Sequence, residues 1–299
     1  MYQGIEMNKT HPVFSPMIQG YWRMAEWGMN TQQQLSFVKQ HLELGITTVD
    51  HAPVYGPDSA CERMFGQVLA LDNSLRDQIE IVSKCGIYRG EAPQVNHYNS
   101  GKAAIVESVD QSLTRLNTDH LDVLLLHRPD LLMDADEAAE AFVQLKAAGK
   151  VKHFGVSNYT PAQFALLQSR VGQPLITNQV EINPVNLQVT EDGTLEQLQQ
   201  HRVQPMAWSC LAGGRIFGEE SEQMRRLRHT LAEVAQEVGA SSIDQVIFAW
   251  VLRLPSKPLP ILGSGNIERV HSAVGALELS LTNEQWYRIW AASKGHGVA

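Results

Sequence analysis

Four polar side chains occupy places where a buried core would not select them. Asp50, Lys84 and His127 each end a short apolar run. Tyr55 follows Asp50 by five positions, in the loop after the first of these runs. A free phenol has a pKa near 10, which is too high for efficient proton transfer at neutral pH. A neighbouring ammonium group would favour the phenolate, so we expect Lys84 to lower the pKa of Tyr55.

Each of these residues has an ordinary explanation when taken alone. An Asp at a strand end commonly caps a helix, a Lys there commonly extends to solvent, and a lone His commonly forms a structural hydrogen bond. The combination is more specific if the three run ends meet. Asp50 would then hold Lys84, and His127 would orient a substrate oxygen by a hydrogen bond. This set is typical of a phenol that acts as a general acid, with its pKa adjusted by its neighbours, beside a pocket that binds an oxygen. It contains no obvious nucleophile.

The elements that must position these residues are eight short apolar runs. Most of them lack apolar and polar alternation, which favours strands buried on both faces of a parallel sheet. The runs lie at Phe14–Gly20, Ile46–Asp50, Ile79–Lys84, Leu121–His127, His153–Ser157, Ile176–Val180, Gln204–Ser209 and Leu259–Leu262.

Helical patterns separate these runs. We expect Thr31 to cap the first helix, Gly45 to end it, and Pro161 to begin a later one after Thr160. The other patterns cover Ser59–Leu69, Lys102–Leu116, Asp134–Ala148, Thr194–His201, Glu222–Val238, Ser242–Leu254, Asn266–Leu277 and Asn283–Ala292.

Eight strands that alternate with helices predict a single (β/α)₈ TIM barrel over residues 1–299. The alternative is an open doubly wound sheet, which normally carries GxGxxG after its first strand. Here the first strand ends in Gly20, Tyr21 and Trp22, so that fingerprint is absent. In a barrel, Asp50, Lys84 and His127 would end the second, third and fourth strands, so their side chains would converge with Tyr55.

The composition narrows the function classes. The chain has 299 residues, with 24 Lys and Arg against 32 Asp and Glu, for a net charge of −8. Such a chain has no general attraction for nucleic acid or anionic membranes. Three widely spaced Cys argue against a disulfide framework, and no HxH or HExxH pattern indicates a metal. Residues 1–10 lack a signal-peptide pattern, and no run is long enough to span a membrane, so we expect a cytoplasmic protein.

These residues resemble the motifs of the aldo-keto reductases, in particular a short-tailed branch that includes the potassium-channel β subunits. The segment from Thr48 to Gly56 resembles the Asp–Tyr motif of that family. Lys84 and His127 resemble the other two members of its catalytic tetrad. The resemblance covers nearly the whole chain and implies a (β/α)₈ barrel that reduces carbonyl compounds with NADPH, with Tyr55 as the proton donor.

The resemblance also implies contacts to the cofactor. Ser157, Asn158 and Gln179 match residues that hold the nicotinamide carboxamide, and Trp208 matches an aromatic ring stacked on the nicotinamide. The remaining expected contacts are Gly20, Tyr21 and Trp22 beside the nicotinamide, Ser209, Leu211 and Gly213 along the pyrophosphate, and Ser264, Asn266 and Arg269 at the adenosine end.

The chain departs from the family pattern at three places. Gly263 replaces a common Lys and Ala273 replaces a common Asn, which weakens the grip on the adenosine, although Arg269 still favours NADPH. Arg128 follows His127 where many relatives carry Trp. We expect it to pair with Asp130 or Asp134; the alternative is that it faces the pocket mouth and favours acidic or strongly polar carbonyl compounds. The short C-terminal tail predicts an open pocket and broad specificity.

Two alternatives to a carbonyl reductase stay open. A barrel aldolase would use Lys84 as a Schiff base, which a charged Lys84 held by Asp50 disfavours. A nicotinamide-binding regulatory protein, like the channel β subunits, would bind a partner and turn over slowly. We expect a monomer acting on a small carbonyl substrate, with no resident metal.

Overall fold

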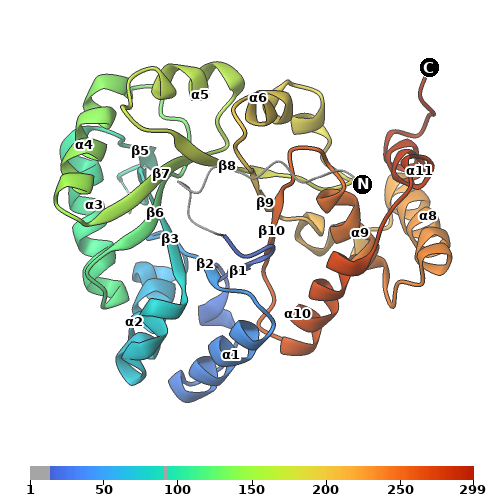
Figure 1. Cartoon of the computed structure of the whole chain (residues 1–299), viewed down its shortest axis with the longest axis horizontal. Helices are drawn as coiled ribbons and strands as arrows, with labels where there is room; N and C mark the ends of the chain where they lie inside the picture. The colour runs from blue at the N-terminus through green and yellow to red at the C-terminus, as the bar shows by residue number, and fades with distance from the viewer. Residues whose placement is uncertain (1–13, 91–92) are drawn as a thin grey trace.

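The computed structural model describes residues 14–90 and 93–299. Residues 1–10, for which no signal peptide is expected, lie outside the described residues. Within them the chain forms a closed barrel of eight parallel strands, as predicted (Figure 1). Around the barrel the strands follow the order β1 (Ile18–Gly20), β2 (Thr48–Asp50), β3 (Glu80–Cys85), β6 (Leu121–Leu126), β7 (Val151–Ser157), β8 (Leu175–Glu181), β9 (Met206–Trp208) and β10 (Leu259–Leu262).

Helices surround this barrel on the outside (Figure 1). Most lie within a few residues of the ranges that the apolar periodicity predicts. They are α1 (Thr31–Glu43), α2 (Ala60–Leu71), α3 (Lys102–Leu116), α4 (Ala135–Ala147), α5 (Pro161–Gln168), α6 (Thr194–Gln200), α7 (Arg215–Gly218), α8 (Glu222–Val238), α9 (Ile243–Leu252), α10 (Ile267–Val274) and α11 (Asn283–Lys294). Helices α8 and α11 pack against each other at the edge of the molecule.

The structure corrects some of the predicted helix ends. Asn30, not Thr31, caps α1, because its side chain accepts a hydrogen bond from the Gln33 backbone while Gln33 bonds back. Thr31 is the first helical residue. At the other end of the chain, α10 stops at Val274 and continues only as a short 3-10 turn.

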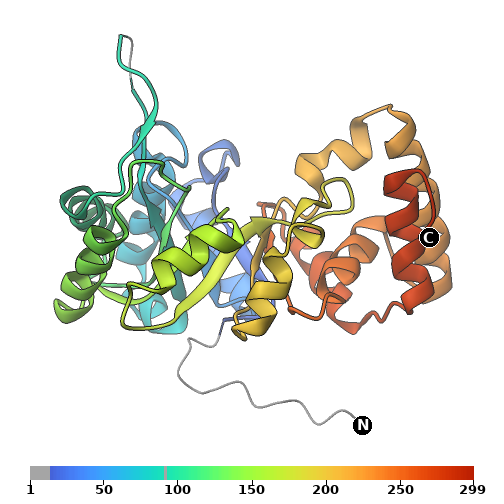
Figure 2. The same ribbon diagram turned by 90° about the horizontal axis from the view of Figure 1, so that it is seen from above.

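A two-stranded antiparallel hairpin is an element that the sequence did not predict. Strands β4 (Ile87–Tyr88) and β5 (His97–Tyr98) pair after β3, and the hairpin projects from the rest of the molecule (Figure 2). Each strand has only two residues, so neither shows a hydrophobic period. The hairpin matters for the site because Arg89, the residue after β4, lines the pocket at the carboxyl ends of the strands.

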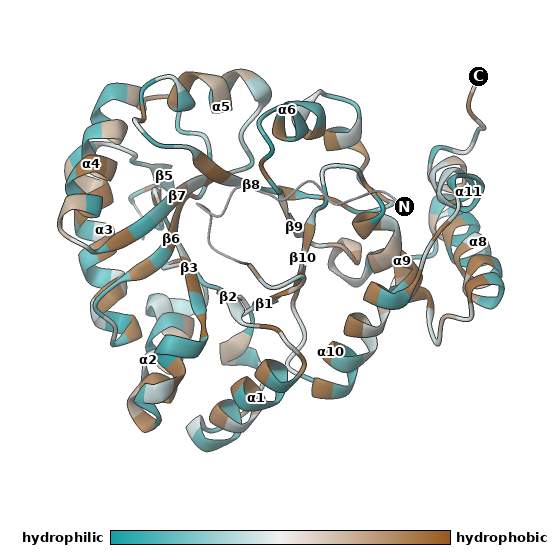
Figure 3. Cartoon of the chain, viewed as in Figure 1, coloured by the Kyte–Doolittle hydropathy of each residue, from teal (hydrophilic) through white to brown (hydrophobic). Residues whose placement is uncertain are grey.

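Two apolar layers hold the barrel together, and Figure 3 shows the strands as largely hydrophobic. Side chains such as Val82, Val123 and Leu125 point inward and fill the barrel with a small core. Their neighbours along the strands, such as Ile81 and Leu124, point outward into a larger core shared with the helices. Since successive strand residues alternate, the inward positions at the carboxyl ends of the strands are set by this packing.

Candidate functional site

The side chains predicted to react lie together at the carboxyl ends of β2, β3 and β6. Lys84 Nζ lies 2.6 Å from Asp50 Oδ1 and 2.9 Å from the Tyr55 hydroxyl oxygen. The Tyr55 hydroxyl lies 3.2 Å from Asp50 Oδ2. These strands are neighbours in the barrel, as predicted. The convergence therefore follows from the order of the strands.

Lys84 is placed by strand alternation and held by three acceptors. Val82 points into the barrel, so Lys84, two residues later, points to the same side. Its side chain is 0% exposed. The ammonium group donates to Asp50, to the Tyr55 oxygen and to the His51 carbonyl at 2.9 Å. Three donors thus find three acceptors, which a buried ammonium requires.

Burial and electrostatics do not lower the pKa of Tyr55 as the sequence led us to expect. Burial of the phenol raises its pKa well above 10, and the neighbouring Asp50 carboxylate raises it further. Burial likewise lowers the pKa of Lys84, whereas Asp50 opposes that shift. Tyr55 therefore keeps its proton in the resting site. A protonated phenol suits a general acid that releases its proton only when charge develops on a substrate oxygen.

His127 stands beside Tyr55 as a neutral imidazole. The two ring centroids are 6.0 Å apart and the rings meet edge to face. Burial, with the charges of Lys84 and Arg128, lowers the pKa of His127 to about 2. A neutral imidazole donates from only one ring nitrogen, so His127 can give a hydrogen bond to a carbonyl oxygen without adding charge.

A single pocket of about 830 Å³ joins this cluster to the expected cofactor residues. Asp50, Tyr55 and His127 line it. Among the residues that the resemblance assigns to the cofactor, all but one also line it, namely Gly20, Trp22, Ser157, Asn158, Gln179, Trp208, Ser209, Leu211, Gly213, Ser264, Asn266 and Arg269.

Tyr21 is the exception, and its prediction as a pocket wall is wrong. Its side chain is 0% exposed and stacks on His51 at 4.9 Å. Its hydroxyl lies 2.8 Å from Nε2 of His41, behind the barrel wall. Residues that follow one another in an extended chain point to opposite sides, so Tyr21 faces the helices when Gly20 and Trp22 face the pocket.

The residues expected to hold a carboxamide bind one another. Asn158 Nδ2 donates to Ser157 Oγ at 2.8 Å, and Trp208 Nε1 donates to Asn158 Oδ1 at 3.0 Å. Gln179 Nε2 donates to Asp50 Oδ1 at 2.7 Å, which links this group to the tetrad. Polar donors and acceptors on one wall suit an amide. The set therefore fits a nicotinamide carboxamide.

A bulge in β8 aims Gln179 into the pocket. Between Phe154 and Val156 on β7, the partner residues on β8 advance from Leu175 to Asn178, one more than regular pairing allows. The extra residue turns Asn178 outward, where its amide contacts Tyr159, and Gln179 inward. A side chain at Gly155 would meet the Thr177 carbonyl at 2.7 Å, so only glycine fits beside the bulge.

At the far end of the pocket the polar residues bind their own backbone. Asn266 caps α10, accepting from the Glu268 backbone at 2.9 Å, and its backbone donates to Ser264 Oγ at 3.1 Å. Arg269 is exposed in the first turn of α10. A helix N-terminus with an arginine beside it is suited to a phosphate group. The pocket thus offers amide contacts at one end and phosphate contacts at the other.

The loop after β9 lies against the pocket. Gly213 and Gly214 adopt positive φ angles of 65° and 91°, and the short helix α7 follows. Leu211 and Phe217 from this segment line the pocket. The loop therefore covers one side of the pocket, and the two glycines provide the turn.

Arg128 does not pair with Asp130 or Asp134, so the favoured prediction is wrong. Asp130 accepts hydrogen bonds from the backbone of Ser100 and Leu132, and Asp134 caps α4. Arg128 instead lines the pocket, with its guanidinium carbon 5.8 Å from the centroid of the Trp208 ring. The acids close in sequence are occupied by local turns, which leaves Arg128 to face the pocket.

Sequence reasoning missed two further arginines of the pocket. Arg89 lies just after β4 and donates to the Val54 carbonyl at 2.6 Å. Arg23 follows Trp22 and donates to the Gly263 carbonyl at 3.3 Å. Both are exposed and lie in short irregular segments. The only signal for Arg23 was its place after the first strand; Arg89 had none.

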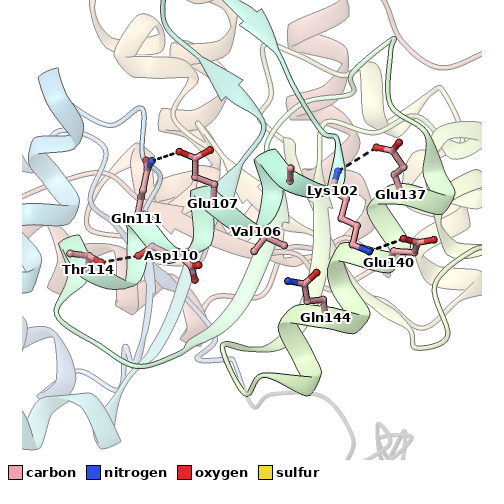
Figure 4. Close-up of a pocket in the computed structure, with 10 residues that line it drawn as sticks. Lys102, Val106, Glu107, Asp110, Gln111, Thr114, Glu137, Glu140 and Gln144 are labelled. Atoms are coloured by element: carbon pink, nitrogen blue, oxygen red, sulfur yellow. Dashed lines mark hydrogen bonds and ion pairs between the residues drawn. The ribbon is translucent and has the colours of Figure 1, made fainter.

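A second hollow of the surface is an open groove between α3 and α4 (Figure 4). Several of its polar residues bind one another. Lys102 pairs with Glu140 at 2.8 Å, and Gln111 donates to Glu107 at 3.0 Å. It lies among the outer helices, and it joins no cluster of reactive groups.

Two kinds of site are absent from residues 14–90 and 93–299. Over this part of the chain no group of three or more His, Cys, Asp or Glu side chains is arranged to hold a metal ion. Nor is any helix there both long and apolar enough to cross a membrane.

The chain is similar to several known proteins. Residues 16–294 match the model of the aldo/keto reductase family. Oxidoreductase YdhF of Escherichia coli K12 is 56% identical over all of both chains. A 6-dehydroglucose reductase of Agrobacterium fabrum is 39% identical, covering 95% of this chain and 96% of its own. A crystal structure of a Klebsiella pneumoniae aldo/keto reductase with NADP and acetate covers 92% of this chain and 90% of its own, with 29% identity and a TM-score of 0.76.

Proposed function

The chain belongs to the aldo/keto reductase family, and from this premise we propose that it reduces aldehydes or ketones to alcohols with NADPH. The observation that carries the proposal is the buried contact of Lys84 with Asp50 and Tyr55 at the floor of the pocket. The NADP in the Klebsiella structure supports the choice of cofactor. The relative named 6-dehydroglucose reductase supports a carbonyl substrate.

In the proposed reaction the protein positions and protonates the carbonyl group. The hydride that the carbonyl carbon receives would come from bound NADPH. His127 donates a hydrogen bond to the carbonyl oxygen and Tyr55 gives it a proton as negative charge grows there. Lys84 lies 2.9 Å from the Tyr55 oxygen and stabilises the phenolate that is left, while Asp50 keeps Lys84 charged. Ser157, Asn158 and Gln179 hold the carboxamide.

The arrangement of Lys84 argues against the Schiff-base alternative. A Schiff base needs a neutral, accessible amine, whereas this amine is 0% exposed and bonded to a carboxylate. Borohydride trapping of a carbonyl compound on Lys84 would contradict our proposal. The regulatory alternative predicts nucleotide binding without substantial turnover, so turnover is the measurement that separates it.

The reaction is tested by following NADPH and NADH oxidation with a panel of short aldehydes. Tyr55→Phe removes the acid, so we expect kcat to fall about 10²–10⁴-fold. Nucleotide binding should persist, because the contacts assigned to the cofactor do not include the Tyr55 hydroxyl. Quenching of the fluorescence of Trp22 and Trp208, which line the pocket, measures that binding. Tyr287→Phe removes an exposed hydroxyl on α11 and is the matched control.

Each outcome has a distinct meaning. Unchanged turnover in Tyr55→Phe would remove this residue from the mechanism. Quenching by nucleotide without turnover of any aldehyde would favour the regulatory alternative. No response to either nucleotide would contradict the cofactor site.

We also propose that the chain acts as one domain and as a monomer in the cytoplasm. The outer core supports one domain, since it runs from Met17 to Ile289. The three free and buried Cys support a reducing compartment. Size-exclusion chromatography with light scattering would test the monomer directly.

A further inference from the structure

Arg128 presents an uncompensated positive charge beside the reactive groups. It follows His127 immediately after β6 and lines the pocket. Its guanidinium carbon lies 5.8 Å from the centroid of the Trp208 ring, and no carboxylate in the described part of the chain pairs with it. Asp130 and Asp134, the acids nearest in sequence, are held by backbone amides.

The charges around this end of the pocket are predominantly positive. Arg89 lines the same end, and its guanidinium group is anchored on the carbonyl of Val54, the residue before Tyr55. Asp50 is already paired with Lys84 and buried. The other acids of the lining, Glu26 and Asp244, come from segments beside β1 and β10, at the nucleotide end.

The geometry of Arg128 leaves it able to bind an anion. A guanidinium group that lies over an aromatic face keeps its in-plane N–H groups free. These match the paired oxygens of a carboxylate or a phosphate. Its charge also reaches the reactive groups, since Arg128 contributes to lowering the pKa of His127 and opposes the rise in that of Tyr55.

We propose that the substrate carries a carboxylate or phosphate group near its reactive carbonyl, and that Arg128 binds this anion. The inference rests on the proposed reduction and narrows its substrate class. Arg128 acts on specificity, because it positions the substrate and takes no part in the proton transfer. Arg89 adds to the positive field at the same end.

Matched pairs of aldehydes test the proposal. The carboxylate arm compares 4-formylbenzoate with 4-formylbenzamide, and the phosphate arm compares glyceraldehyde 3-phosphate with glyceraldehyde. We expect the wild-type protein to prefer the anion in at least one arm, and the larger ratio of kcat/KM identifies the anion. Arg128→Gln should reduce that ratio roughly 10–100-fold, which is the effect on affinity of losing a charge-assisted hydrogen bond. Most of the change should be a higher KM for the anionic aldehyde.

Two further variants separate binding from structure. Arg128→Lys keeps a charge without the planar pair of donors, so it should restore part of the ratio. Arg63→Gln removes an arginine outside the pocket, which donates to the Asp58 carbonyl, and should leave the ratio unchanged. High salt should lower the wild-type ratio and have less effect on Arg128→Gln.

Three results would overturn the anion site. The wild-type protein could reduce both members of each pair equally, Arg128→Gln could slow both members equally, or the variant could weaken NADPH binding instead. Titration of tryptophan fluorescence with benzoate and benzamide gives the same comparison without turnover. If no aldehyde is reduced while benzoate still binds more tightly through Arg128, the reductase proposal fails and the anion site stands.

Discussion

The two ends of the pocket differ in how far their polar side chains are buried. Above β2, β3 and β6, Asp50 and Lys84 are buried and bound to each other and to Tyr55. Beside β10 and α10, Asn266 and Arg269 are exposed, and the Asn266 side chain accepts a hydrogen bond from the backbone of its own helix. The first end is assembled before any ligand arrives. The second end offers the N-terminus of α10 and the exposed side chain of Arg269, which a bound phosphate would order.

This difference follows from what each end must do. Proton transfer requires groups fixed at hydrogen-bond distance in surroundings from which water is excluded. Recognition of a charged nucleotide can rely on exposed groups, because phosphate contacts at the surface tolerate side-chain motion.

Among the substitutions that test this difference, the largest loss of stability and turnover is expected at Lys84. Lys84→Met leaves the Asp50 carboxylate buried without its charged partner, which costs about 3–5 kcal/mol of stability. Turnover should fall at least about 10²-fold, because Tyr55 loses its electrostatic support. Urea unfolding and kcat measure the two effects.

Lys102→Met is the matched control for Lys84→Met. Lys102 pairs with Glu140 at 2.8 Å, but the two side chains are 42% and 64% exposed. Such exposed pairs contribute about 0–1 kcal/mol. Adding Asp50→Asn to Lys84→Met should recover part of the stability and none of the activity. Equal costs for the two lysines would contradict a buried, preassembled reaction end.

An intermediate effect is expected from the buried imidazoles behind β2. Burial lowers the pKa of His41 to about 4 and that of His51 to about 3, from 6.5. Between these values and pH 6.5 the unfolded chain binds more protons, so stability rises with pH there. Each proton contributes about 1.4 kcal/mol per pH unit, so the two give a slope of about 2.7 kcal/mol per pH unit near pH 5.

Urea unfolding across this pH range measures the slope. Among the residues that the structure describes, neither ring nitrogen of His51 has a hydrogen-bond partner, and the ring packs against Tyr21 and Phe65. His51→Phe should therefore lower the slope by about 1.4 kcal/mol per pH unit. His229→Phe, at an exposed position, is the control. A slope that His51→Phe leaves intact would show that this imidazole titrates alike in both states.

The smallest effect is expected at the nucleotide end. Arg269→Gln should raise the Kd for NADPH about 10-fold by removing a charged contact to the 2′-phosphate. Binding of NADH should not change, because it lacks that phosphate. Stability should stay within about 0.5 kcal/mol, since the side chain is exposed. Equal weakening of both nucleotides, measured by fluorescence quenching, would place Arg269 elsewhere on the cofactor.

The sequence carried more information about the reaction end than about the rim of the pocket. Asp50, Lys84 and His127 end apolar strands, so both their positions and their convergence were predictable once a barrel was assumed. Tyr21 was misplaced because one position of alternation decides between pocket and core. Arg89 stands after a two-residue strand, which shows no pattern. The partner of Arg128 was misjudged because backbone turns claim Asp130 and Asp134.

The sequence by itself determined the barrel, the order of its strands and the residues at the strand ends, because apolar periodicity and chain order are local properties. Tertiary structure decided the direction of Gln179, since one extra residue in β8 reverses which side chains face the pocket. It also decided the protonation of Tyr55, because burial raises the pKa of the phenol more than neighbouring positive charge lowers it. Burial, register and competition between partners are set only when distant segments meet.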